Sequence, residues 1–249
     1  MTSSASTGIE VAYMKRYGSI FMLLCRSVLY KLVAVFFGTA ALHTAVYFVL
    51  LGSQCNIETI YDHWGMKTVF GVGLFLTTAL LVSTLTQSGS KLDYTIRRLR
   101  IWNRSLCLCQ SIFNAACFMM FWAVEILVAL LLCRLWVNTM GAESHQTVYL
   151  AFYRSELLHS LLPLDDVSRW VRNLVVFLCL GICSACGPVL QRRGDGHWGI
   201  LSLPVVLGFV FPGKAAAVSN DVLIAFMAAV AAFTLSVNVW WEEFQNEEH

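Results

Sequence analysis

The chain has 249 residues, of which 58% are hydrophobic and 13% are charged, and its mean hydropathy is +0.67. Soluble domains carry about a quarter charged residues and less than half apolar ones, so the composition excludes an ordinary soluble domain and predicts an all-α integral membrane protein. The net charge of +2 is small and the basic residues flank apolar runs, which argues against nucleic-acid binding.

The first predicted element is an amphipathic helix over residues 13–31. Polar side chains recur on one face of this helix and apolar side chains on another. We expect the helix to lie at the membrane interface before the first span. The alternative is that these residues simply extend the first span.

Six apolar runs are predicted to cross the membrane, because a bilayer core needs about 20 residues of helix. The fifth run is short and carries Pro204, and the longest polar segment, 134–169, separates the third run from the fourth. That segment is expected to contain a surface helix that ends near Pro163. No Pro-rich or Gly/Ser-rich linker divides the chain, so residues 1–249 are predicted to form a single transmembrane domain. The predicted spans are about 32–51, 67–86, 106–133, 170–190, 198–211 and 221–241.

The distribution of Lys and Arg predicts how these spans are oriented. With the N-terminus inside, eleven of the seventeen basic residues fall on the inner side and six on the outer side. This bias follows the positive-inside rule. Six spans return the C-terminus to the side of the N-terminus. We therefore expect a multi-pass protein of the cell (plasma) membrane with both termini cytoplasmic.

A basic stretch, residues 88–104 (SGSKLDYTIRRLRIWNR), lies between the second and third predicted spans. As a short amphipathic helix, it would separate a narrow apolar stripe from most of its cationic side chains. Such a helix can rest on the bilayer surface or press into a soluble partner. The simpler interpretation is that it supplies only topogenic positive charge. Its charged residues are Lys91, Asp93, Arg97, Arg98, Arg100 and Arg104.

Two ionisable residues fall inside predicted spans. Glu125 is the only acid in the middle of the third run, and an ionised carboxylate at that depth costs at least a few kcal/mol, so it should face other helices or a cavity. We weigh two roles for Glu125 evenly: a substrate or proton contact, and a structural hydrogen-bonding group. His43 in the first run is expected to be structural, and Tyr47 follows one helical turn later.

The sequence predicts neither a metal site nor a nucleotide site. Cys179, Cys183 and Cys186 share a helical face, but no His or carboxylate accompanies them, so we expect a packing face and no metal. Residues 208–215 match the spacing of a phosphate-binding loop as far as its lysine. Ala215 stands where that loop needs a hydroxyl for magnesium, so no nucleotide site is expected.

Polar residues between the third and fourth spans could serve a hydrolase. No nucleophile-elbow glycines and no zinc-protease motif surround them, so a solvated amphipathic cap is the preferred interpretation. The set consists of Arg154, Glu156, His159, Asp165 and Asp166.

The layout resembles that of the ABC-2 type permeases, the membrane subunits of a class of ATP-driven transporters. The shared features are an amphipathic N-terminal helix, six spans and a short cytoplasmic basic helix between spans two and three. Residues 89–99 (GSKLDYTIRRL) are similar to the segment through which that family docks its cytoplasmic ATPase. The chain departs from the family in having no proline soon after Arg-Arg-Leu and no room for two re-entrant helices before the last span.

The resemblance implies a transport subunit without catalytic residues and without a cofactor of its own, because ATP would bind the partner ATPase. A second permease copy or a similar subunit would complete the path through the lipid bilayer. The alternatives are a non-transporting membrane scaffold or immunity-type protein and a membrane-embedded hydrolase. By resemblance, ATPase coupling falls to Lys91, Asp93, Tyr94, Arg97, Arg98 and Arg100. Apart from the resemblance, the positions of Glu125 and His43 inside predicted spans make them a candidate intramembrane polar site.

Overall fold

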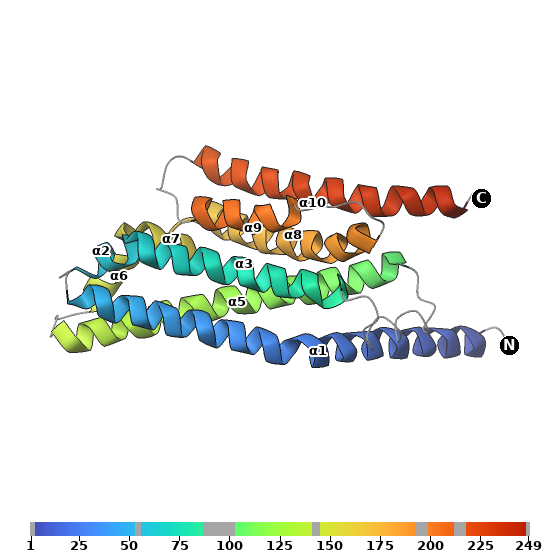
Figure 1. The fold of residues 1–249 in the computed structure, drawn as a ribbon, viewed down its shortest axis with the longest axis horizontal. Helices are drawn as coiled ribbons and strands as arrows, with labels where there is room; N and C mark the ends of the chain where they lie inside the picture. The colour runs from blue at the N-terminus through green and yellow to red at the C-terminus, as the bar shows by residue number, and fades with distance from the viewer. Residues whose placement is uncertain are drawn as a thin grey trace.

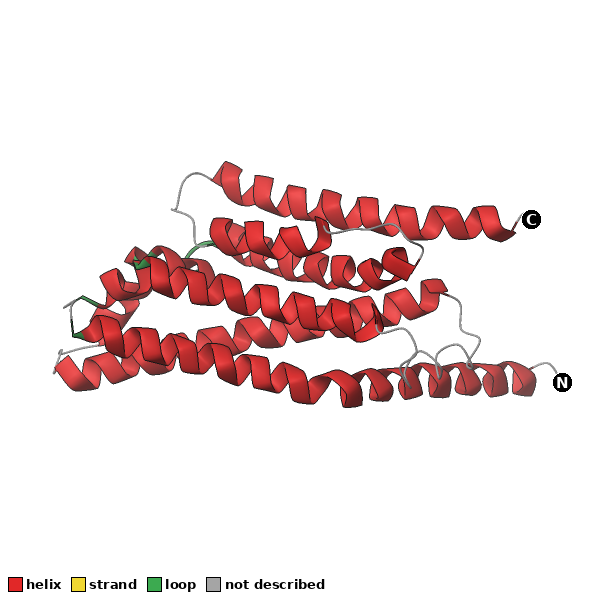
Figure 2. Cartoon of the chain, viewed as in Figure 1, coloured by secondary structure: helices red, strands yellow, loops and turns green. Residues whose placement is uncertain are grey.

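The structure is a computed structural model and describes residues 3–52, 56–86, 103–140, 145–192, 199–211 and 218–247. Within these ranges every regular element is a helix, which confirms the all-α class (Figure 2). The helices are α1 (Ser3–Leu51), α2 (Ile57–Asp62), α3 (Trp64–Thr86), α5 (Asn103–Met140), α6 (His145–Arg154), α7 (Glu156–Leu161), α8 (Val167–Arg192), α9 (Gly199–Val210) and α10 (Val218–Glu247).

Five of the described helices are long and apolar enough to cross a membrane. The chain therefore has the architecture of a multi-pass membrane protein. The apolar stretches agree closely in position with five of the six predicted spans. They are Cys25–Leu51, Trp64–Ser83, Ser105–Thr139, Val167–Leu190 and Asn220–Trp240.

The fifth predicted span, 198–211, becomes the short helix α9. Its 12 residues extend over about 18 Å, which is less than the roughly 30 Å hydrocarbon core of a bilayer. The described residues thus contain five helices of full span length and one shorter apolar helix. The prediction of six complete spans is not confirmed.

The prediction of a separate interfacial helix over residues 13–31 is not confirmed. α1 runs from Ser3 to Leu51 without a break, so these residues belong to the same helix as the first span, whose apolar stretch begins at Cys25. The segment contains no proline, and its one glycine, Gly18, is not enough to end a helix. Most of the basic stretch lies outside the described residues, and only Asn103 and Arg104 are seen, as the start of α5.

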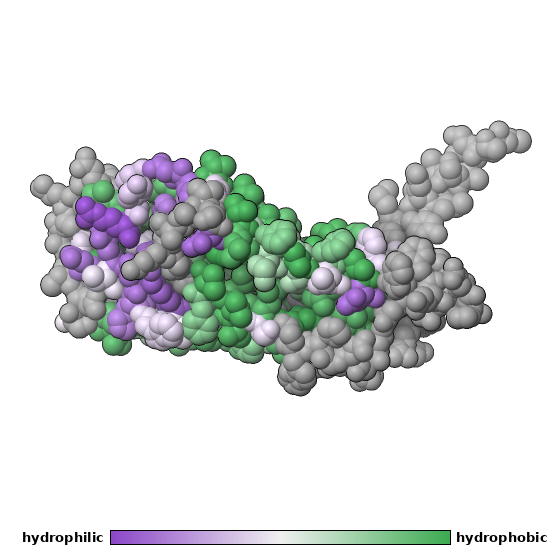
Figure 3. All heavy atoms as spheres, turned by 90° about the horizontal axis from the view of Figure 1, so that it is seen from above, coloured by the Kyte–Doolittle hydropathy of each residue, from purple (hydrophilic) through white to green (hydrophobic). Residues whose placement is uncertain are grey.

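The long helices lie side by side and define two ends of the molecule (Figure 1). We call the end formed by α2, α6 and α7 the cap end, and the end where α1 begins and α10 finishes the terminal end. Hydrophilic side chains gather at the cap end, and a broad hydrophobic band covers the middle of the molecule (Figure 3). This distribution is the one expected of a bundle whose middle lies in lipid.

α8 is the central helix of the bundle, packed against α5 on one side and α10 on another. In α8, 72% of the span is buried inside the bundle, compared with 17% in α10. Glycine allows the closest of these contacts: a Cβ atom on Gly181 of α8 would lie 2.6 Å from the backbone nitrogen of Ala115 in α5. α1 and α10 therefore present apolar faces outward, while α8 is enclosed by its neighbours.

The cap end is held together by hydrogen bonds that the polar segment 134–169 makes to α2 and α3. The carboxylate of Asp62 accepts hydrogen bonds from the Ser155 hydroxyl at 2.9 Å and from the Glu156 backbone N–H at 2.8 Å. These bonds satisfy donors at the start of α7. Lys67 pairs with Glu156 at 2.7 Å. The surface helix expected before Pro163 is therefore present, as α7, but several of its apolar side chains are buried beneath the cap.

Candidate intramembrane polar site

A stripe of hydrogen-bonding side chains runs along the inner face of α1. Thr39, His43 and Tyr47 are spaced four residues apart, so they share one face of the helix. All three are buried, whereas Phe37 and Leu42 on the other faces are exposed. The polar face of this span therefore points into the bundle and its apolar faces point outward.

α5 places a second stripe of the same spacing opposite the first. Glu125, Ala129 and Cys133 are all buried. The cap helix α2 closes the stripe from above, since the hydroxyl of Tyr61 donates to the carbonyl of Ala129 at 3.3 Å. Burial, with smaller contributions from Cys133 and Tyr47, raises the pKa of Tyr61 well above its ordinary value, so this phenol keeps its proton.

His43 and Glu125, the two ionisable residues predicted from the sequence, meet between α1 and α5. Nδ1 of His43 lies 3.2 Å from Oε2 of Glu125, and the two side chains are 5% and 3% exposed. Thr39 lies beside the Glu125 carboxyl, and its own hydroxyl donates to the carbonyl of Phe36 at 3.0 Å. We call His43, Glu125, Thr39, Tyr47 and Tyr61 the polar seam.

The contact lets this pair stay electrically neutral inside the bundle. Imidazole with carboxylic acid and imidazolium with carboxylate hold the same number of protons and differ only in where one proton lies, and neither form carries a net charge. A lone carboxylate at this depth would cost at least a few kcal/mol. The pair can therefore move a proton between its members without placing an isolated charge in the bilayer.

Three polar atoms of the seam make no hydrogen bond within the described part of the chain: Nδ1 of His43, Oε1 of Glu125 and the hydroxyl of Tyr47. Buried polar atoms are nearly always paired, with protein or with water. These three atoms therefore leave the seam able to bind a water molecule, a proton or a polar group of another molecule.

Gly73 of α3 lets a third helix approach the seam. A Cβ atom at this position would lie 2.7 Å from Cγ2 of Thr39 and 3.0 Å from the ring of Phe121. A Cβ contact of 2.7 Å is essentially never seen, so a larger residue here would force Thr39 to shift. The seam is enclosed by α1, α3 and α5 together, with α2 above it.

A second buried ionic cluster joins α8 to α10 near the cap end, and it was not predicted. Nη1 of Arg172 lies 2.7 Å from Oδ1 of Asp221, and Nε of Arg169 lies 3.5 Å from Oδ2 of Asp221 and 3.5 Å from Oδ2 of Asp166. Arg172 also sits 5.0 Å from the ring centroid of Phe211, in cation–π range. Arg169, Arg172 and Asp221 are buried, so the cluster ties the two helices together in an environment that excludes water.

The polar set considered for a hydrolase is dispersed. Arg154 is exposed and pairs with Glu58 at 3.7 Å. Glu156 is held by Lys67, Asp165 is exposed, and His159 is buried. The contacts of the described residues bring no nucleophile and base from this set together.

The residues expected to couple to an ATPase lie outside the described residues, so their role stays a prediction. They are Lys91, Asp93, Tyr94, Arg97, Arg98 and Arg100.

The cysteine face of α8 is buried as expected, and Sγ of Cys186 lies 3.6 Å from Sγ of Cys107 in α5. Among the described residues, no three His, Cys, Asp or Glu side chains gather as metal ligands.

Acid is expected to loosen the cap end through His159. Burial lowers the pKa of His159, and the positive charge of Arg169 lowers it further. The unfolded chain, with a histidine pKa of about 6.5, binds the proton more readily. The stability that His159 contributes is therefore complete above about pH 6.5 and is lost as the pH falls below it.

The measurement is thermal unfolding, or limited proteolysis of the α6–α7 region, between pH 7.5 and 5.5, with His159→Phe as the comparison. Phenylalanine keeps the ring contact with Tyr153, whose centroid lies 5.9 Å away, and cannot titrate. The variant should lose less stability in acid than the unchanged protein. Equal losses would show that other groups cause the acid sensitivity.

No protein-family model, curated protein or solved structure matches this chain.

Proposed function

We propose that this chain is the membrane subunit of an ATP-driven transporter, and that it works with a separate ATPase and a second permease copy or similar subunit. The observation that carries the proposal is the buried His43–Glu125 contact at 3.2 Å. Ionisable residues inside spans are expensive in lipid and often mark the path of a substrate or a proton. The unpaired Oε1 of Glu125 and hydroxyl of Tyr47 give this path a place to bind a polar group.

The connections of α3 and α5 support the coupling part of the proposal. α3 ends at Thr86 and α5 begins at Asn103, both at the terminal end, so the segment between them is attached to two helices that enclose the polar seam (Figure 1). An ATPase that moved this segment would displace α3 and α5 relative to α1. Two arrangements of these helices, with different access to the seam, are the minimum that such a mechanism requires.

The outward faces of α1 and α10 support the partner and location parts. Large apolar side chains on both helices are exposed, as lipid or a second subunit in a cell membrane would require. In the proposed topology the terminal end is cytoplasmic, and α9 is a sixth, incomplete crossing. ATP binds only the partner ATPase.

The test is the ATPase activity of this chain purified in complex with an ATPase that co-purifies with it. Reversing two charges, with Arg97→Glu and Arg98→Glu together, should abolish the stimulation of the ATPase by the membrane subunit. The control is Arg192→Glu, which changes a cation at the end of α8 on the same side of the bundle. Unchanged stimulation in the double variant would reject the coupling role, and stable partner binding with no turnover would favour a scaffold.

A further inference from the structure

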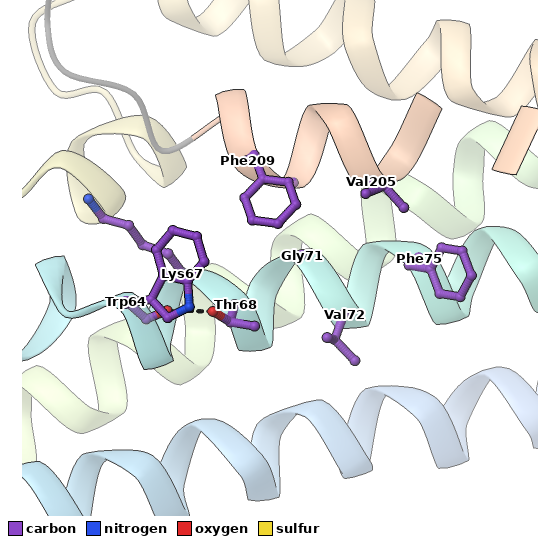
Figure 4. Close-up of a pocket in the computed structure, with 9 residues that line it drawn as sticks. Trp64, Lys67, Thr68, Gly71, Val72, Phe75, Val205 and Phe209 are labelled. Atoms are coloured by element: carbon purple, nitrogen blue, oxygen red, sulfur yellow. Dashed lines mark hydrogen bonds between the residues drawn. The ribbon is translucent and has the colours of Figure 1, made fainter. Parts of the chain in front are cut away.

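A groove runs along the outside of the bundle between α3 and α9 (Figure 4). It has a volume of about 280 Å³, and its lining is almost wholly apolar. α3 contributes residues from Trp64 to Phe75, and α9 contributes Val205, Gly208 and Phe209. Because both helices are apolar and α3 is a span, the groove opens toward the lipid.

The floor of the groove exists because two glycines meet there. A Cβ atom on Gly71 would lie 3.5 Å from the Cα of Gly208, so the two backbones are in direct contact. No side chain rises from the crossing point to fill the space above it. Trp64 and Phe209 form the mouth, with ring centroids 5.7 Å apart.

The length of the groove matches the depth of one leaflet. From Trp64 to Phe75, α3 rises by about 16 Å, and half of a bilayer core is about 15 Å. Trp64 lies at the cap-end start of the span, where tryptophan usually marks the membrane interface. The groove therefore begins near the interface and ends near the middle of the bilayer.

The groove is too small for a helix and large enough for a single extended chain. A helix about 10 Å across and about 16 Å long would occupy roughly 1,250 Å³, whereas the empty space in and over the groove is about 730 Å³. We propose that this groove binds one acyl chain of a bilayer phospholipid, with its carbonyl end at Trp64 and its methyl end at Phe75. This inference does not depend on the proposed transport function.

The head group of the bound lipid is not selected by charge. Lys67 is the one cation among the described residues that line the groove, and its ammonium pairs with Glu156 at 2.7 Å. The pair is neutral, so it offers no net attraction to an anionic head group. Phosphatidylcholine and phosphatidylglycerol should therefore occupy the groove equally well.

The test uses the full chain in nanodiscs with phosphatidylcholine that carries a photoreactive diazirine on one acyl chain. A diazirine near the carbonyl should label peptides around Trp64, and one near the terminal methyl should label peptides around Phe75 and Val205. Even labelling of all lipid-facing helices would overturn the proposal, and so would a strong preference for phosphatidylglycerol. Contact of the groove with a second copy, in place of lipid, would overturn it as well.

Two neighbouring valines of α9 provide a matched pair of variants. Val205 lines the groove and is 41% exposed, whereas Val206 does not line it and is 56% exposed. Val205→Trp should fill the groove and reduce labelling there several-fold, while Val206→Trp should leave it unchanged. Val72→Trp, at another exposed lining position, should repeat the loss. Equal labelling in all three variants would overturn the proposal.

Discussion

Replacing Asp221 by alanine is expected to cost about 3–5 kcal/mol of unfolding free energy, because the change leaves buried charge without its partner. Asp221 is the carboxylate shared by Arg172, at 2.7 Å, and Arg169, at 3.5 Å. Without it, two buried guanidinium groups would have only Asp166, which is partly exposed, as a counterion. The connection between α8 and α10 should weaken first.

The measurement is equilibrium unfolding of the purified protein in mixed micelles. Arg154→Ala is the control, because Arg154 is 63% exposed and its pair with Glu58 spans 3.7 Å, so its loss should cost at most about 1 kcal/mol. Asp221→Asn should fall between the two, since an amide can still accept from Arg172 but carries no charge. If Asp221→Ala were no more harmful than Arg154→Ala, the buried cluster would not bear on stability.

Much of this architecture follows from hydrophobic length alone. Five apolar runs of about 20 residues became five helices of span length, and Glu125 turned inward as the cost of a charge in lipid requires. The partner of Glu125 could not be derived, because periodicity identifies the face of a helix but not the helix it meets. His43 was recognised as a polar group in the first span, yet its contact with Glu125 depends on the packing of α1 against α5.

Other features of the structure were not predicted from the sequence, and the reasons can be named. Arg172 and Asp221 are 49 residues apart, and no helical periodicity links positions so far apart in the chain. Both sit within the first turns of helices that begin at the cap end, and opposite charges at such positions are a usable signal for pairing. The shortness of the fifth apolar run and its Pro204 already indicated a short helix at the position of α9. The continuity of α1 was missed because a polar face was interpreted as a change of environment.

Replacing Gly181 by alanine should separate α5 from α8 and cost about 1–3 kcal/mol, as overpacking of a close contact does. The new Cβ would lie 2.6 Å from the nitrogen, 2.7 Å from the Cα and 2.7 Å from the Cβ of Ala115. Two of these three atoms are backbone, so no rotamer change can relieve the overlap. The unfolding measurement used for Asp221 would detect the loss.

Two further variants separate a steric cause from a general effect of glycine replacement. A Cβ on Gly38 meets nothing within 4 Å, so Gly38→Ala should be neutral or stabilising by up to about 1 kcal/mol. Adding Ala115→Gly to Gly181→Ala removes one of the three short contacts and leaves the two backbone ones, so it should restore only part of the loss. α8 also carries Arg172, so a displaced α8 would weaken the link to α10 as well. The combined Gly181→Ala and Asp221→Ala variant should therefore lose less unfolding free energy than the sum of the two single losses. Equal stability of the Gly181 and Gly38 variants would mean that α5 and α8 do not cross this closely.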